Sequence, residues 1–117
     1  MMNTLTQKKI NSRAKGSRGE LELSKFLTDH GFPARRGQQF QGSPDSPDIV
    51  CDSLKQYHIE CKRVERGNPY LWIEQANKDK GEFQSPVVMH RRSDKPWLAI
   101  LYLEDLLELL GNYYAKN

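Results

Sequence analysis

Residues 47–62 read PDIVCDSLKQYHIECK and contain two short apolar segments separated by a polar turn. Residues 48–51 and 57–62 carry the β-branched and aromatic side chains typical of strands, and residues 52–56 form the turn between them. The simplest arrangement is an antiparallel hairpin centred on Leu54. In that register Asp48 lies opposite Glu60, and Cys51 lies opposite Tyr57.

The hairpin predicts an unusual pair of like charges. Directly opposed side chains have Cβ atoms about 4.5–5.5 Å apart, so the Asp48 and Glu60 carboxylates repel each other unless something neutralises them. Side chains alternate along a strand, so Lys62 shares the face of Glu60, whereas Ile59 and Cys61 point to the opposite, apolar face. We therefore expect one face of the hairpin to carry the chemistry and the other to join the core.

A divalent cation explains this charge pair, because Mg²⁺ prefers carboxylate oxygens and keeps several waters. A bound ion lowers the pKa of a coordinated water and stabilises charge on a phosphodiester. Lys62 would position that water or neutralise the transition state. The alternative is a surface salt bridge between Lys62 and the two acids, which contributes about 0–1 kcal/mol.

A third acid lies on the preceding helix, predicted over residues 17–30 from the spacing of its apolar side chains and ended by Gly31. Glu20 falls at the edge of the apolar stripe, next to Leu23, whereas Glu22 is expected to point to solvent. Glu20 either faces the sheet as a further metal or water ligand or is merely stabilised by the dipole of the first helical turn.

The rest of the chain alternates between helix and strand. Residues 33–40 are predicted to be extended. Asn68-Pro69 is an N-cap and first-turn pair that opens a helix to about Lys80. Strands are expected over 86–90 and 97–103, the second in a buried position. They are followed by a helix over about 104–114 whose four leucines are expected in the core, with a protein interface as the alternative. The order αβββαββα indicates an α/β domain with a single sheet flanked by helices.

Composition limits the classes of protein that the chain can be. With 117 residues, 37% of them hydrophobic and 28% charged, it can build one modest core, and we expect a single domain over 16–117 after a flexible basic arm over 1–15. The longest apolar run, residues 97–103, is too short to cross a membrane. The first ten residues lack the apolar segment of a signal peptide, and two cysteines do not make a disulfide scaffold. These features favour the cytoplasm, or the host cytoplasm for a phage-encoded protein.

Basic residues gather in particular segments, although the net charge is only +3. Residues 1–19 contain five lysines and arginines and no acid, and further basic groups occur at residues 35–36, 62–63 and 90–92. A folded chain could bring these groups into one surface for phosphates. The alternative is ordinary solvated surface charge.

Other kinds of site fit the sequence poorly. The intervals between Cys51, His58, Cys61 and His90 do not match a zinc site, and His58 and Cys61 face opposite sides of one strand. Neither a nucleophilic-serine motif nor a phosphate-binding P-loop is present. His58 and His90 are expected at the surface or near phosphate. Trp72 and Trp97 are expected in the core, with base stacking on DNA as the alternative.

Taken in order, the motifs resemble those of the PD-(D/E)XK nuclease superfamily, and most closely the archaeal-type Holliday junction resolvases and their phage relatives. The matching positions are Lys15-Gly16 with Glu20, Gly42-Ser43 before Pro47-Asp48-Ile49, Ile59-Glu60-Cys61-Lys62, and Gln75 on the next helix. Pro44-Asp45 is a second Pro-Asp pair. Asp48 is preferred because it begins the apolar strand and closes a compact hairpin, whereas Asp45 falls in the loop.

The resemblance implies a restriction-endonuclease-like fold with a mixed central sheet, Mg²⁺-dependent phosphodiester hydrolysis in which Mn²⁺ substitutes, and a homodimer that cuts branched double-stranded DNA. By position it implies that Glu20, Asp48 and Glu60 are acidic metal-site residues and that the Cys61 carbonyl also binds metal. Lys62 would be the catalytic lysine, Ser43 would assist at the scissile phosphate, and Gln75 would approach the active site. Lys15 and Arg36 match DNA contacts, to which we add Arg18, Arg35 and Arg63 as phosphate ligands.

A metal-dependent, structure-selective endonuclease of the Holliday junction resolvase type is therefore the leading hypothesis. A nicking or repair nuclease on the same fold is one alternative. A non-catalytic nucleic-acid-binding module, in which the acidic cluster is incidental, is the other.

Overall fold

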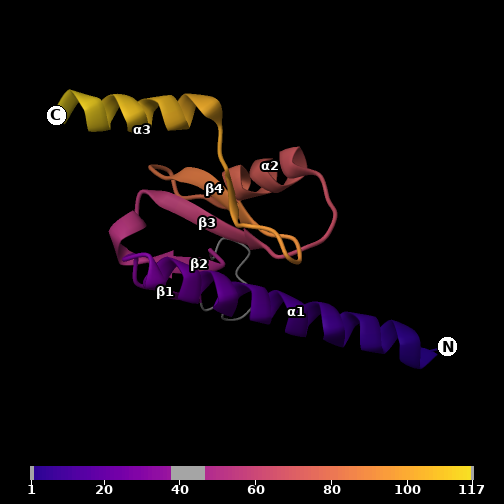
Figure 1. The fold of residues 1–117 in the computed structure, drawn as a ribbon. Coiled ribbons are helices and arrows are strands. Elements are labelled where there is room, and N and C mark those ends of the chain that lie inside the picture. Colours follow the sequence, from indigo (N-terminus) through magenta and orange to yellow (C-terminus); the bar gives the residue numbers. More distant parts are fainter. Residues whose placement is uncertain (1, 38–46, 117) are drawn as a thin grey trace.

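The computed structural model describes the backbone of residues 2–37 and 47–116 and the side chains of residues 16–37 and 47–115. The order of its elements confirms the predicted αβββαββα order (Figure 1). They are α1 (Met2–Asp29), β1 (Ala34–Arg36), β2 (Ile49–Cys51), the short 3-10 helix η2 (Asp52–Leu54), β3 (Tyr57–Lys62), α2 (Pro69–Asp79), β4 (Ser85–His90), β5 (Leu98–Ile100) and α3 (Leu103–Lys116).

The strands form one mixed sheet in the order β1-β2-β3-β4-β5. β2 pairs antiparallel with both β1 and β3, β3 pairs parallel with β4, and β4 pairs antiparallel with β5. Ile49 is the partner of Ile59 across the β2–β3 hairpin, which confirms the predicted register. Because β3 and β4 are parallel, the chain must cross over between them, and α2 makes this connection.

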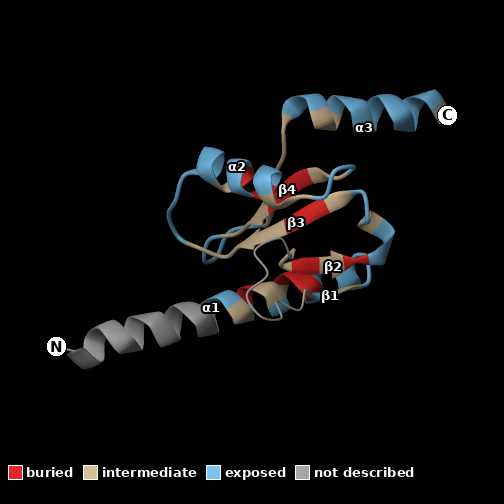
Figure 2. Ribbon diagram, turned by 180° about the vertical axis from the view of Figure 1, so that it is seen from behind, coloured by how far each residue is buried: buried red, intermediate tan, exposed pale blue. Residues whose placement is uncertain are grey.

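Helices cover both sides of the sheet, as Figure 1 shows for α1 and α2. Leu23 and Leu27 of α1 belong to a buried cluster with Ile49, Cys51 and Ile59 of β2 and β3. On the other side, α2 contributes Ile73 and Ala76 to a second cluster with Val88 of β4. The buried residues therefore concentrate in the central strands and the helix faces against them (Figure 2). The parallel crossover therefore covers the face expected to carry the chemistry as well as the face expected to join the core.

Helix α1 is longer than the sequence pattern predicted. It begins at Met2, so the helix includes residues 2–15, and the flexibility expected for this arm stays a prediction. The segment contains neither proline nor glycine before Gly16, and no residue in it breaks the helical hydrogen bonding. That residues 16–117 make a single domain stays a prediction.

The last two elements also differ from expectation. β5 covers only Leu98–Ile100 and lies at the edge of the sheet, where Leu98 is 56% exposed and not buried as predicted. α3 leaves the sheet and runs away from it (Figure 1), so Leu107, Leu109 and Leu110 are exposed and not in the core. An apolar stripe on a helix becomes a buried face only when the chain folds back and packs that helix against the sheet. None of the described helices has the length and apolarity needed to cross a membrane.

The two tryptophans were expected in the core, and the structure packs them against the two buried clusters. Trp97 is partly buried beside the α1 cluster, where its ring lies 6.4 Å from that of Phe26. Trp72 is partly buried beside the α2 cluster, and its ring lies 4.7 Å from that of His90. These contacts confirm a packing role for both rings.

Gly37 allows β1 and β2 to approach each other beside Asp48. Its N–H donates to the Asp48 carbonyl at 2.8 Å, and a Cβ at this position would lie 1.9 Å from the backbone oxygen of Pro47. Gly37→Ala must therefore separate the two chain segments. We expect a loss of about 1–3 kcal/mol in the free energy of unfolding, measured by chemical denaturation. Gly16→Ala is the control, because its Cβ meets no atom within 4 Å and alanine favours the helix. Equal stability of the two variants would contradict this account.

Candidate active site

Asp48 and Glu60 face each other at the open end of the β2–β3 hairpin. The Asp48 N–H donates to the Ile59 carbonyl at 3.2 Å, which continues the pairing of Ile49 with Ile59 by one residue. One Asp48 carboxyl oxygen, Oδ2, accepts the Cys61 N–H at 2.9 Å. The Asp48 carboxyl also hydrogen-bonds to the Glu60 side chain. The structure thus brings together the two acids that the register predicted as neighbours.

Burial changes the chemistry of this pair. Loss of hydration is the largest cause that raises the pKa of Asp48 to about 8, followed by its hydrogen bond to Glu60 and the charge of Glu60. The Cys61 N–H opposes this effect, and the charge of Glu20 adds to it. In the protein without metal, Asp48 therefore keeps a proton at neutral pH. A divalent cation could replace that proton, because it neutralises both carboxylates at once.

Glu20 lies near this pair but is turned toward an arginine. Its Oε2 lies 3.1 Å from Arg36 Nε, and its side chain is only 16% exposed. Arg36 also donates to the Ser17 hydroxyl at 3.1 Å. The prediction that Glu20 sits at the edge of the apolar face agrees with this burial. No three acidic, histidine or cysteine side chains among the described residues converge closely enough to hold a metal ion.

The Cys61 side chain points away from the Glu60 face of β3, toward the α1 cluster. Burial and the nearby charges of Asp48 and Glu20 raise the pKa of the Cys61 thiol to about 12. The thiol therefore stays protonated at neutral pH and is a poor metal ligand. The role given to Cys61 uses only its backbone carbonyl, and that role stays a prediction.

Lys62 lies two residues beyond Glu60 on the same strand and is half-buried. Within residues 16–37 and 47–115, no carboxylate oxygen lies within 4.0 Å of its amine, whereas most neighbouring arginines are ion-paired. Its positive charge lowers the pKa of the adjacent Cys61 thiol slightly, against the larger effects that raise it. A lysine two residues from Glu60 that makes no ion pair with a described residue suits a role in charge stabilisation.

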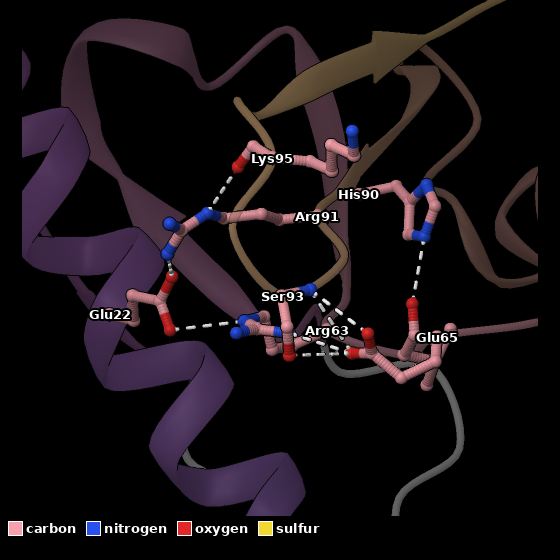
Figure 3. Close-up of polar contacts among 8 residues, drawn as sticks. Glu22, Arg63, Glu65, His90, Arg91, Ser93 and Lys95 are labelled. Atoms are coloured by element: carbon pink, nitrogen blue, oxygen red, sulfur yellow. Dashed lines mark hydrogen bonds and ion pairs between the residues drawn. The ribbon is translucent and has the colours of Figure 1, made fainter.

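Glu22 and Arg63 form a network that the sequence did not suggest (Figure 3). Glu22 accepts from Arg63 Nε at 3.2 Å and also pairs with Arg91. Arg63 bonds Glu65 as well, and Glu65 accepts the Ser93 N–H at 3.0 Å. Glu22 is only partly exposed, so its expected position in solvent is wrong. The network joins α1, the end of β3 and the loop after β4.

The remaining phosphate-binding candidates differ in their exposure and in their ion pairs with acidic side chains. Arg18 is exposed. Arg35 is 67% exposed and lies 4.0 Å from Asp52, whereas Arg36 and Arg63 are held by Glu20 and Glu22. The Lys15 side chain and all of Ser43 lie outside the described residues.

Gln75 is not brought to the acidic pair. It is exposed on α2, and its amide donates to both carboxylate oxygens of Asp79 at 3.1 Å. A role for Gln75 near the acids stays a prediction.

Sequence reasoning missed His58 as a member of the site. Its side chain is 1% exposed, and its Nε2 lies 2.7 Å from Glu60 Oε1, so its expected position at the surface is wrong. The spacing of two residues along a strand already placed it on the face of Glu60. His90, which was also expected near the surface, is half-buried and bonds the Val64 carbonyl at 3.0 Å.

The donor set fits a hard divalent cation. Asp48 and Glu60 offer adjacent carboxylate oxygens, the kind of ligand that Mg²⁺ and Mn²⁺ prefer, and neither zinc-type thiolate nor free imidazole is present beside them. Glu20 is a further candidate, with its Oε2 paired to Arg36. The two acids are thus the primary ligands that this geometry supports.

A mixed sheet between helices, with opposed carboxylates and a lysine on its second and third strands, defines the restriction-endonuclease-like class of nuclease. The sequence matches the family model described as archaeal Holliday junction resolvase (Hjc) over residues 11–108, most of the chain. The chain therefore belongs to the archaeal Holliday junction resolvase family, a family of nucleases, which confirms the resemblance. No curated protein and no solved structure gave a match.

Proposed function

We propose that this chain is a divalent-metal-dependent endonuclease that hydrolyses phosphodiester bonds in branched double-stranded DNA. The observation that supports it best is the opposed pair of Asp48 and Glu60, whose side chains are hydrogen-bonded to each other, in a chain that belongs to the resolvase family. A buried acid pair of this kind destabilises the fold when both acids are ionised, unless a cation neutralises them. Such a cost is typical of a functional site.

Each residue near the pair has a distinct task in this proposal. Asp48 and Glu60 hold Mg²⁺, and the Cys61 N–H keeps Asp48 in place. The ion, when bound, lowers the pKa of a water and neutralises charge on the scissile phosphate. Lys62 directs its ammonium at that phosphate and stabilises the additional negative charge of the transition state. Glu20 would turn from Arg36 toward the metal site, and Arg36 would then be available to bind a DNA phosphate.

DNA contacts are proposed for the basic side chains along α1 and β1. Arg18 and Arg35 are exposed and can reach phosphates, whereas Arg63 is neutralised by two carboxylates and contributes less. Lys15 and Ser43 keep the roles that the resemblance implies. Contacts of this kind read the shape of the junction and not its sequence, and they weaken steeply as salt rises.

A homodimer is part of the same proposal, because one chain carries one such site and resolution needs two incisions in opposite strands. We expect a mass in solution near twice the 13.6 kDa of the chain. A strictly monomeric protein that still makes paired cuts would contradict the homodimer but not the nuclease activity.

The proposed activity is tested by comparing a synthetic four-way junction with linear duplex of the same arm sequence, in Mg²⁺, Mn²⁺ or EDTA. We expect the junction to be cut with either metal, the duplex to resist, and EDTA to stop the reaction. Arg18→Ala should weaken junction binding and reduce its salt dependence, whereas Lys25→Ala, which removes an exposed charge paired with Asp29, serves as the control. Equal cutting of both substrates would favour a nicking or repair nuclease, and binding without cutting would favour a non-catalytic module.

A further inference from the structure

His58 is a buried polar side chain whose position packing alone does not explain. Its side chain is 1% exposed, on the sheet face that α2 covers, and its neighbour in β4 is the buried Pro86. Burying an imidazole costs free energy unless its polar atoms are hydrogen-bonded. A leucine or valine would fill a central strand position without that cost. The hydrogen bond that His58 makes should therefore explain why a histidine occupies this position.

That bond is made to Glu60. His58 Nε2 lies 2.7 Å from Glu60 Oε1, a short distance for a bond between a ring nitrogen and a carboxylate oxygen. A carboxylate has no proton to give, so Nε2 donates. The bond takes up one oxygen of Glu60, while the Glu60 side chain also contacts Asp48. One buried, rigid strand neighbour thus determines how the Glu60 carboxylate is turned.

We propose that His58 is a positioning residue that holds the Glu60 carboxylate in the orientation needed to bind the divalent cation, and that His58 itself touches neither cation nor DNA. The inference rests on the proposed function, because it assigns Glu60 to the cation. Metal-ligating carboxylates are commonly oriented by a hydrogen-bond partner, and loss of such a partner typically weakens metal binding about 10–100-fold.

Metal binding by the free protein tests this role without using activity. Mn²⁺ affinity is measured from the electron paramagnetic resonance signal of the free ion, in the absence of DNA. We expect His58→Leu to weaken Mn²⁺ binding roughly 10–100-fold. His58→Gln should recover much of the loss, because its amide can donate at nearly the place of Nε2. His90→Leu is the matched control, since His90 hydrogen-bonds a backbone carbonyl and its ring lies against that of Trp72 in a tilted arrangement.

A double-mutant cycle separates positioning through Glu60 from a general loss of stability. If His58 acts through Glu60, adding His58→Leu to Glu60→Gln should weaken Mn²⁺ binding no further. Circular dichroism checks that each variant is folded. If His58→Leu does not fold, His58→Met, which also lacks a donor, is compared with His58→Gln, and the glutamine variant should bind Mn²⁺ more tightly.

The cleavage assay adds a second distinction. We expect excess Mn²⁺ to restore cleavage in His58→Leu, because only the affinity for metal is reduced. Wild-type Mn²⁺ affinity in the folded His58→Leu or His58→Met protein, or losses that add in the double mutant, would overturn the role of His58 alone. Absence of Mn²⁺ binding and of cleavage in the wild type would overturn the proposed function itself, and the role of His58 with it.

Discussion

Asp48→Asn is expected to remove junction cleavage and, in the same protein without metal, to increase thermal stability at alkaline pH. The asparagine amide carries no negative charge, so it cannot neutralise a divalent cation. It also has no acidic proton that the cation could displace. We expect the cleavage rate to fall by roughly 10³-fold, the loss typical when one preorganised charge is removed from an active site. Binding of the junction should persist, because its phosphate contacts lie on other residues.

The stability effect follows from the pKa of Asp48. Folding raises this pKa from its ordinary value of 3.8 to about 8, mainly by burial. Between those two values the folded chain holds a proton that the unfolded chain has released, so the free energy of unfolding falls as pH rises through that window. Below the lower of these two pKa values Asp48 is protonated in both states, so it no longer makes the free energy of unfolding depend on pH. Asparagine does not ionise, so the variant should lack this decline.

Thermal unfolding in EDTA is followed by circular dichroism from about pH 5 to about pH 9, and it compares the pH dependence of stability in the wild type and in Asp48→Asn. Asp52→Asn is the matched control, because the Asp52 side chain is 73% exposed and should change the pH profile little. Mg²⁺ should raise the melting temperature of the wild type and not of Asp48→Asn, since only the wild type binds it tightly. Parallel pH profiles for the wild type and Asp48→Asn would contradict the buried proton.

Lys62→Ala is expected to have the second large effect, a fall of roughly 10²–10³-fold in the cleavage rate under single-turnover conditions. The amine makes no ion pair within residues 16–37 and 47–115, so its charge remains available to the scissile phosphate. Removal of a positive charge beside Asp48 and Glu60 should leave Mn²⁺ binding intact or tighten it slightly. This pattern is opposite to that of His58→Leu.

Single-turnover cleavage and Mn²⁺ affinity are therefore measured on the same Lys62→Ala preparation. Lys55→Ala removes an exposed lysine from the turn between β2 and β3 and is the control. Excess metal should not restore cleavage in Lys62→Ala. A normal rate would contradict a catalytic role for Lys62, and a loss that excess metal repairs would show that Lys62 supports the metal site and not the transition state.

Much of the site could be predicted because its main geometry is local. A short polar turn sets the register of the two strands beside it, and Ile49 does pair with Ile59 as the turn position implied. Opposition of Asp48 and Glu60 follows from that register. The burial that raises the pKa of Asp48 depends on α1 and the rest of the sheet, and no local pattern contains it.

The errors share one physical origin. The leucines of α3 form an apolar stripe, yet whether that stripe is buried depends on where the chain goes after β5. The charges of Glu22 and Arg63 looked like independent surface groups, but they lie 41 residues apart in sequence and 3.2 Å apart in space. Contacts of that kind arise from packing between distant elements.

The sequence by itself determined the order of the elements, the hairpin register and the acidic pair beside a lysine, because periodicity and turn position act over a few residues. Only the tertiary structure decided that β3 pairs in parallel with β4 and that α2 covers the Glu60 face. A sheet covered on both faces turns His58 from an expected surface residue into a buried partner of Glu60. Burial is a property of the whole packed chain, and the chemistry of these side chains depends on it.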